Sequence, residues 1–224
     1  MSYRLSRRAL LMASSLLALP AGGSVAADKD TIVVSQASDV LTLDPMLDTS
    51  PISFNVFRNI FDALTRVEAD GSVGPLLAQS WTPSAEATVW EFTIRSGAKF
   101  HNGQPVTAQD VVWSYQRLER ETKSPVRTYI SKVKSVEAVE SNKVRFTLSE
   151  PYAPFDRQVS LISIVPRKAF EEMGAAQFAL TPVGAGPFKV VAWKKDVFVA
   201  RDRVRDGNFH VSGIPETSKE AIVR

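Results

Sequence analysis

Two stretches of the chain alternate apolar and polar residues with the period of two that is typical of half-buried β-strands. The alternation runs along Ala87–Arg95, and Leu76–Thr82 is the natural antiparallel partner of this stretch. It recurs along Lys143–Leu148, which follows Val133–Glu140 after a Ser-Asn turn. The pattern therefore predicts two β-hairpins in the middle of the chain.

Other stretches carry apolar residues at helical spacing. Ile52–Leu64 has this spacing and follows a proline, which suits the first turn of a helix. Thr107 and Asp110 have the spacing of a capping box, which marks the start of a helix. The buried stripe of that helix is predicted to consist of Val111, Val112, Tyr115 and Leu118. A shorter helix is expected over Arg167–Met173, where the next residue is a glycine.

The remaining elements are short strands. Thr31–Ala37 is rich in β-branched residues and predicts a buried strand. A tight loop over Pro182–Pro187 precedes a predicted strand at Phe188–Trp193, and a weaker strand is expected at Asp196–Arg201. Isolated helices among short strands predict an α+β fold with mixed sheets.

The C-terminus ends inside a predicted element. Thr217–Glu220 has the spacing of a second capping box, and the helix that it would open has only Ala221–Arg224 before the chain stops. A helix this short is unstable without packing. We therefore expect the chain to be an N-terminal fragment of a longer fold. The alternative is a frayed natural terminus.

Residues 1–26 have the features of an export signal. Arg4, Arg7 and Arg8 precede an apolar run over Ala9–Leu19, which is too short to span a bilayer. Small residues at the −3 and −1 positions place cleavage after Ala26, or one residue later. The arginine pair also fits a twin-arginine signal, so general secretory and twin-arginine export both stay open. With no cysteine to carry a lipid, the sequence predicts a soluble protein of a Gram-negative periplasm.

The charge balance argues against a nucleic-acid partner. The chain has 27 Lys and Arg residues against 24 Asp and Glu residues. Three of the basic residues lie in residues 1–26, which leaves 24 basic against 24 acidic residues beyond them. The basic excess belongs to the export signal, so no nucleic-acid partner is expected. The lack of cysteine excludes disulfides, thiolate metal sites and thiol nucleophiles.

A longer motif, from Leu77 to Leu118, carries a family resemblance. The pattern W-x-F-x-[LI]-R-x-G-x-K-F-H-[DN]-G-x-P-x-T-A-x-D-V-V is present from Trp90 to Val112. Shorter matches extend it in register: Leu43-Asp44-Pro45, Phe61–Arg66, Pro75–Trp81 and Pro182–Phe188. Together they resemble family 5 extracellular solute-binding proteins, the peptide-type receptors of ABC importers. One departure is Glu86-Ala87, which stands where the family often has a flexible Asp-Gly turn.

The resemblance implies a fold of the periplasmic-binding-protein type II, in its peptide-binding cluster. Residues 27–224 would form the first lobe, with a β-rich satellite subdomain over about residues 46–165, and the second lobe would be missing. The resemblance also implies a monomeric receptor that closes two lobes over a small peptide and delivers it to ABC transporter membrane permease subunits. Receptors for nickel complexes, opines or oligosaccharides are alternatives within the family. An exported fragment with no transport role is another.

Two segments are expected to face the ligand. The residues are Gln36, Ser38, Asp39 and Leu41 in the first segment, and Gly184, Ala185 and Gly186 in the second. The first segment is similar to the family's first-lobe cleft wall, and backbone with a few polar side chains suits an extended peptide. The second would bring backbone N–H groups close to a ligand. The alternatives are a solvated loop for the first segment and a purely structural turn for the second.

No catalytic residue, metal site or cofactor is expected. The chain has two histidines, His101 and His210, and contains neither HExxH nor GxSxG. His101 precedes the predicted helix at Thr107 and is expected to be structural. An exported hydrolase stays as a third alternative, but the sequence offers no nucleophile–base pair for it.

Overall fold

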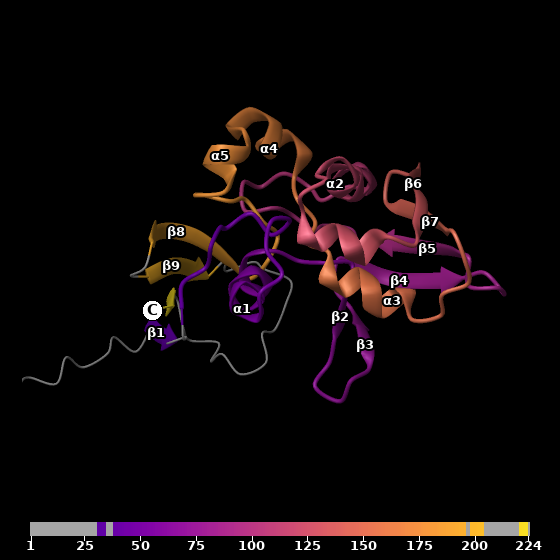
Figure 1. Ribbon diagram of the computed structural model, residues 1–224, viewed down its shortest axis with the longest axis horizontal. Coiled ribbons are helices and arrows are strands. Elements are labelled where there is room, and N and C mark those ends of the chain that lie inside the picture. Colours follow the sequence, from indigo (N-terminus) through magenta and orange to yellow (C-terminus); the bar gives the residue numbers. More distant parts are fainter. Residues whose placement is uncertain (1–30, 35–37, 196–197, 204–219, 224) are drawn as a thin grey trace, which may run out of the picture.

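The computed structural model describes residues 31–34, 38–195, 198–203 and 220–223, which form an α+β fold (Figure 1). The helices are α1 (Pro51–Ile60), α2 (Ala108–Arg120), α3 (Phe155–Gln158), α4 (Arg167–Met173) and α5 (Ala175–Phe178), with the 3-10 helices η1 (Pro125–Ile130) and η2 (Val159–Leu161). The strands are β1 (Thr31–Val34), β2 (Thr65–Val67), β3 (Val73–Pro75), β4 (Ala78–Pro83), β5 (Val89–Ile94), β6 (Val133–Glu140), β7 (Lys143–Leu148), β8 (Phe188–Lys194), β9 (Phe198–Arg203) and β10 (Glu220–Val223). The predicted export signal lies outside the described residues. Within them, no helix combines the length and the apolar character needed to cross a membrane.

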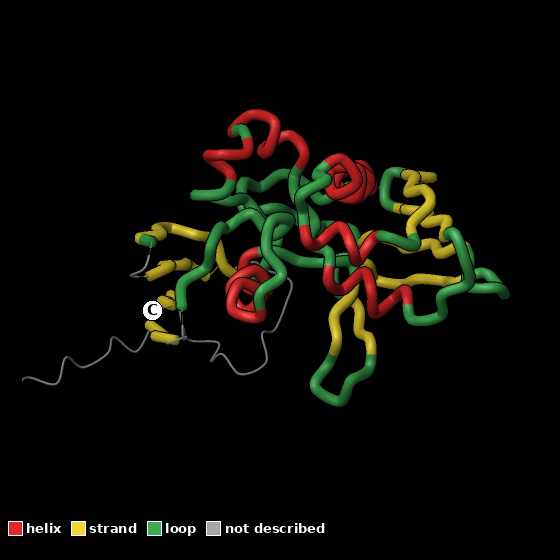
Figure 2. The backbone as a smooth tube through the Cα atoms, viewed as in Figure 1, coloured by secondary structure: helices red, strands yellow, loops and turns green. Residues whose placement is uncertain are grey.

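Two four-stranded sheets lie at opposite ends of the molecule, and loops run between them (Figures 1 and 2). The first has the strand order β1-β10-β9-β8, in which only the β1–β10 pair is parallel. The second is antiparallel, with the order β4-β5-β7-β6. The first sheet therefore combines the two ends of the described chain, whereas the second is built from consecutive hairpins.

The second sheet confirms both predicted hairpins. On β5, Trp90, Phe92 and Ile94 are buried and the residues between them are only partly buried. Phe92 packs edge-to-face on Phe146 of β7, with ring centroids 5.5 Å apart. Tyr115 of α2 lies against the same Phe146 ring at 4.8 Å, which places the buried stripe of α2 on this sheet. The alternation in the sequence thus determined which face of the sheet becomes the core.

The predicted capping box at the start of α2 is also present. The Thr107 side chain accepts a hydrogen bond from the Asp110 amide at 3.3 Å, and the Asp110 carboxylate accepts from the Thr107 amide at 3.0 Å. The four residues of the predicted stripe are all buried. Helix α4 has the predicted bounds and ends at Gly174, whose φ of 76° lies in the region that favours glycine.

Helix α1 is shorter than predicted. It was expected over Ile52–Leu64 but ends at Ile60, and Phe61 is already extended, with φ −119° and ψ 145°. The carbonyl of Ile60 accepts a hydrogen bond from the Gly186 amide at 2.9 Å instead of continuing the helix. Phe61 and Leu64 are buried, so these apolar residues pack in the core without being part of the helix.

The predicted C-terminal helix is wrong. Glu220–Val223 is strand β10, which pairs in parallel with β1 and antiparallel with β9. Four residues are too few for a stable helix, and the two neighbouring strands offer hydrogen-bond partners to an extended backbone. The expected strand at Asp196–Arg201 is observed two residues later, as β9.

Candidate ligand-facing site

Asp39, one of the residues expected to face a ligand, joins the loop after β1 to strand β8. The indole Nε1 of Trp193 on β8 donates to the Asp39 carboxylate at 3.1 Å, and the Val40 amide donates to its other oxygen at 2.8 Å. Ser38 is exposed, and Leu41 has 74% of its surface exposed. Gln36 lies outside the described residues. The loop therefore presents an exposed apolar side chain beside a carboxylate that is held in place.

The residues that follow this loop are anchored in the core. The Leu43 amide donates to the Ala179 carbonyl at 3.1 Å. Asp44 is fully buried and accepts from Arg117 Nη1 of α2 at 3.1 Å. The Ser124 hydroxyl, just before η1, donates to the Met46 carbonyl. These contacts fix the loop to elements that lie far from it in the sequence.

Asp48 continues this framework at the start of α1. Its carboxylate accepts hydrogen bonds from the Ser50 amide at 2.9 Å and from the Ser53 hydroxyl. Burial acts to raise the pKa of Asp48, but the hydrogen bonds from Ser53 and Ser50 outweigh it and hold the pKa below its ordinary value. The carboxylate is therefore charged at neutral pH and holds Ser50 and Ser53 at the start of α1. Leu47, the residue before Asp48, has 41% of its surface exposed.

The second predicted segment, Gly184–Gly186, is held by His101. The Gly184 amide donates to His101 Nδ1 at 3.2 Å, and His101 Nε2 lies 2.9 Å from the Gly186 carbonyl. Both contacts are satisfied by a neutral imidazole that carries its proton on Nε2. Burial lowers the pKa of His101, which favours this neutral form. His101 therefore has the structural role that its position in the sequence suggested.

Both glycines also lie against the end of α1. A Cβ atom on Gly184 would come 1.9 Å from the Ile60 carbonyl oxygen, and one on Gly186 would come 2.7 Å from the Asn59 carbonyl oxygen. The amides of Gly184 and Gly186 are used inside the protein, by His101 and Ile60 respectively. The close packing explains the need for glycine at both positions. A ligand contact by this loop stays a prediction.

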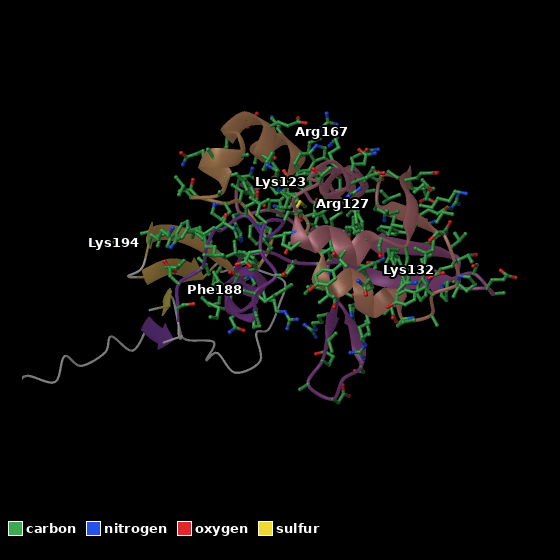
Figure 3. All side chains as sticks on the ribbon, in the orientation of Figure 1. Lys123, Arg127, Lys132, Arg167, Phe188 and Lys194 are labelled. Carbon is green, nitrogen blue, oxygen red and sulfur yellow. The ribbon has the colours of Figure 1, made fainter. Side chains whose placement is uncertain are left out.

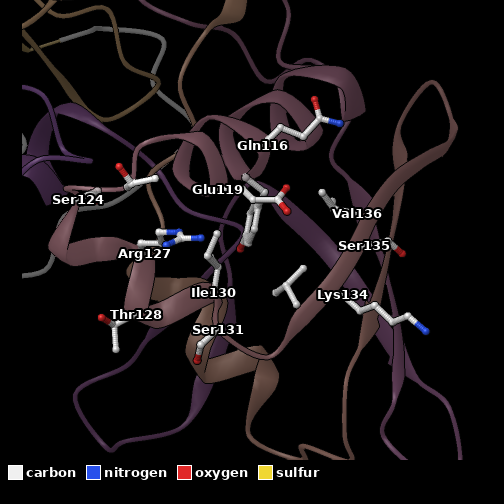
Figure 4. A pocket seen from close by; sticks show the side chains of 13 residues that line it. Gln116, Glu119, Ser124, Arg127, Thr128, Ile130, Ser131, Lys134, Ser135 and Val136 are labelled. Carbon is white, nitrogen blue, oxygen red and sulfur yellow. The ribbon is translucent and has the colours of Figure 1, made fainter.

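Two hollows in the described structure are formed by other residues than those of the predicted segments, although Pro187, which follows Gly186, lines the smaller one. The larger, about 740 Å³, is a groove between α2, η1 and β6. In Figure 4 the side chains of Glu119 and Arg127 extend into this space, whereas Lys134 points away from it. The smaller, about 370 Å³, lies beside α1 and the β2–β3 hairpin. Neither is lined by a residue that the sequence assigned to ligand binding.

Basic side chains are spread over the molecule. In Figure 3, Lys194 lies at the end of β8, Arg167 at the start of α4 and Lys132 near the second sheet. Trp193 contacts Asp39 of the first predicted segment, although the sequence did not assign it to the site. Its indole N–H, which needs an acceptor when it is partly buried, was the available signal.

The comparison with known proteins decides the family. Residues 72–213 match the family described as bacterial extracellular solute-binding proteins, family 5 Middle. The chain belongs to this family. It is 32% identical over 205 residues to the probable D,D-dipeptide-binding periplasmic protein DdpA of Escherichia coli K12, which covers 87% of this chain and 39% of that protein.

Solved structures agree with this assignment. DppA from Helicobacter pylori in complex with the peptide STSA is 28% identical, has a TM-score of 0.75, and matches 87% of this chain and 42% of its own. MoaA from A. tumefaciens R10 in complex with mannopinic acid is 30% identical, has a TM-score of 0.78, and matches 88% and 41%. The fold is therefore that of the periplasmic binding proteins of the peptide-binding cluster. The chain spans about two fifths of the length of these relatives.

Proposed function

We propose that this chain is part of the substrate-binding component of an ABC importer, that its solute is a small peptide, and that it acts in the periplasm. The observation that carries the proposal is the likeness, in sequence and in fold, to receptors whose names specify a dipeptide or whose structures hold a peptide. Binding proteins of this kind carry a solute and do not transform it. Membrane permease subunits of the importer would be the partners of a monomeric receptor.

The loop after β1 suits this role. Asp39 is fixed by Trp193 and Leu41 is exposed beside it, so a carboxylate and an apolar side chain are presented on one anchored segment. A carboxylate pairs with the amino terminus of a peptide, and an exposed backbone segment can pair with its main chain. Residues 38–41 are therefore the proposed ligand-facing segment, together with Gly184–Gly186.

Domain organisation and export belong to the same proposal. The sheet that runs from β4 to β7, with α2 packed on it, supports a satellite subdomain over about residues 46–165 beside the first-lobe sheet. Residues 1–26 would direct export and be removed. Replacement of Arg7 and Arg8 by lysine separates the two routes, since a twin-arginine signal depends on the pair.

Thermal unfolding of the chain, followed by tryptophan fluorescence, tests the binding proposal. The ligands are D-Ala-D-Ala, the tetrapeptide Ser-Thr-Ser-Ala and, for the opine alternative suggested by MoaA, mannopinic acid. A ligand that binds only the folded chain raises the midpoint in a concentration-dependent way. We expect a rise with a peptide, reduced in Asp39→Asn and unchanged in the matched control Trp81→Phe.

Two other results of this unfolding experiment would contradict peptide binding by this chain. A rise with mannopinic acid alone would assign the chain to opine uptake. A cooperative transition that no member of the panel shifts would argue against binding by this chain by itself. A solute bound between two lobes needs contacts from both of them, so a receptor with both lobes would then have to be tested.

A further inference from the structure

The smaller cavity has the composition of a binding site for a small molecule. Its volume is about 370 Å³, and it lies between α1, the β2–β3 hairpin and the segment around η2. Phe54, Phe57 and Phe61 contribute rings to its wall. Pockets that take small molecules are mostly apolar and hold a few polar groups that orient the ligand. This cavity contains both kinds of residue.

Asp62 is the polar group that most needs an explanation. It lines the cavity with only 2% of its surface exposed, and its Oδ2 atom has no hydrogen-bond partner in the part of the chain that the structure describes. Its own carbonyl accepts from the Ile164 amide at 2.9 Å, so the backbone at this position is held firmly. A buried carboxyl oxygen without a partner costs free energy, which a ligand donor or acceptor would recover.

The charged groups around Asp62 decide which ligand fits. Arg58, Arg66 and Glu68 line the cavity, and Arg66 Nε pairs with Glu68 Oε1 at 2.6 Å. Burial raises the pKa of Asp62 to about 8, although the nearby guanidinium groups of Arg95 and Arg66 act to lower it. Asp62 is therefore protonated at neutral pH and its O–H is a hydrogen-bond donor.

This arrangement favours an anion. With Asp62 neutral, the charged groups that line the cavity are the guanidinium groups of Arg58 on α1 and Arg66 on β2 and one carboxylate, that of Glu68. A ligand ammonium would be repelled by the guanidinium groups, whereas a ligand carboxylate would be attracted by them and could accept from Asp62.

We propose that this cavity binds a small carboxylate with an apolar body, whose carboxylate accepts the Asp62 O–H and faces Arg58 and Arg66 while its body packs on the phenylalanine rings. The cavity adjoins the Gly184–Gly186 segment through Pro187, but none of the residues proposed to face a peptide lines it, so the two proposals can be tested independently. An aromatic acid such as 3-phenylpropanoate matches the volume and the ring-lined wall.

Calorimetric titration of the full chain with 3-phenylpropanoate at pH 7 tests the site, with 3-phenylpropan-1-amine as the charge-reversed control. We expect the carboxylate to bind and the amine not to bind. Above pH 8 the affinity for the carboxylate should fall by about tenfold per pH unit, because Asp62 must then take up a proton to bind it. Arg58→Gln should weaken binding at every pH.

Asp62→Asn separates a role in the site from a role in folding. The asparagine keeps a donor and the side-chain shape but does not titrate, so binding should persist and become independent of pH between 7 and 9.5. Glu172→Gln, on the exposed face of α4, is the matched control and should keep the pH dependence of the unmodified chain. Binding of the amine, equal pH profiles in Asp62→Asn and the unmodified chain, or no binding of the carboxylate by a chain that unfolds cooperatively would each overturn the proposal.

Discussion

Arg117 on α2 and Asp44 in the loop before α1 form a buried ion pair between positions 73 residues apart in the sequence. Arg117 Nη1 donates to Asp44 Oδ1 at 3.1 Å, and the guanidinium carbon lies 3.9 Å from the centre of the Phe170 ring. Asp44 is fully buried and Arg117 is 8% exposed. This pair attaches the loop that carries the proposed ligand-facing residues to the helix that covers the second sheet.

Removal of one partner should destabilise the fold strongly. Arg117→Met leaves a buried carboxylate unpaired, which costs about 3–5 kcal/mol in the free energy of unfolding. The double variant Asp44→Asn/Arg117→Met should recover part of this loss, because no buried charge then remains. Urea unfolding followed by tryptophan fluorescence measures both effects.

An exposed ion pair supplies the control. Lys168 and Glu172 lie 3.8 Å apart on the surface of α4, and Lys168→Met should change stability by at most about 1 kcal/mol. Similar losses in Lys168→Met and Arg117→Met would contradict the importance assigned to the buried pair.

Gly184→Ala should destabilise the loop that His101 holds. The new Cβ atom would lie 1.9 Å from the Ile60 carbonyl oxygen, so the backbone must shift, at a cost of about 1–3 kcal/mol or more. Gly71→Ala is the matched control, because it has a φ of 85° but open space around it, and should cost only about 1–2 kcal/mol. Thermal unfolding of both variants provides the measurement. An equal or smaller loss in Gly184→Ala would show that the loop yields easily.

Ala87→Gly should stabilise the first hairpin. Ala87 has a φ of 51°, a conformation that costs an L-residue about 1–2 kcal/mol, and it stands where the sequence lacks the expected glycine. Relief of this strain outweighs the greater flexibility of glycine in the unfolded chain, for a net gain of about 0.5–1 kcal/mol. Ala85→Gly, in the same turn but without a positive φ, should lose stability. Denaturant unfolding compares the two, and a loss in both variants would count against strain at Ala87.

The stability of the fold should decrease from pH 4 to pH 8 through Asp62. Its pKa is raised from an ordinary value of 3.8 to about 8, so in this range the folded chain holds one proton more at this site than the unfolded chain. The free energy of unfolding then falls by about 1.4 kcal/mol per pH unit from this group. Asp62→Asn, which does not titrate, should match the unmodified chain near pH 4 and be more stable at pH 8.

Asp70→Asn is the control for this pH effect. Asp70 is exposed, and hydrogen bonds from Ser72 lower its pKa, which is the opposite direction. Relative to the unmodified chain, Asp70→Asn should therefore gain no stability as the pH rises from 4 to 8. Parallel stability curves for Asp62→Asn and the unmodified chain from pH 4 to pH 8 would mean that Asp62 is ionised in the folded chain.

Local patterns in the sequence were sufficient for the second sheet and for α2. The alternation around Trp90 and Phe146, and the capping box at Thr107, act between residues that are close in the sequence or in adjacent strands. Such interactions are readable without a structure because side-chain period and cap spacing follow from backbone geometry. The motif between Trp90 and Val112 was sufficient to indicate the family for a similar reason, because its residues form one continuous stretch of the sequence.

The ends of elements and the composition of the sites depended on distant contacts. The Gly186 amide donates a hydrogen bond to the Ile60 carbonyl where α1 ends. Glu220–Val223 is a strand because it pairs with β1 and β9. The Asp39–Trp193 and Asp44–Arg117 pairs, and the cavity around Asp62, likewise join segments far apart in the chain. By itself the sequence determined the α+β class, the hairpins, the capped helix and the family. Tertiary structure alone decided which polar groups meet and which stay unpaired, because burial and hydrogen bonding between distant segments exist only once the chain has packed.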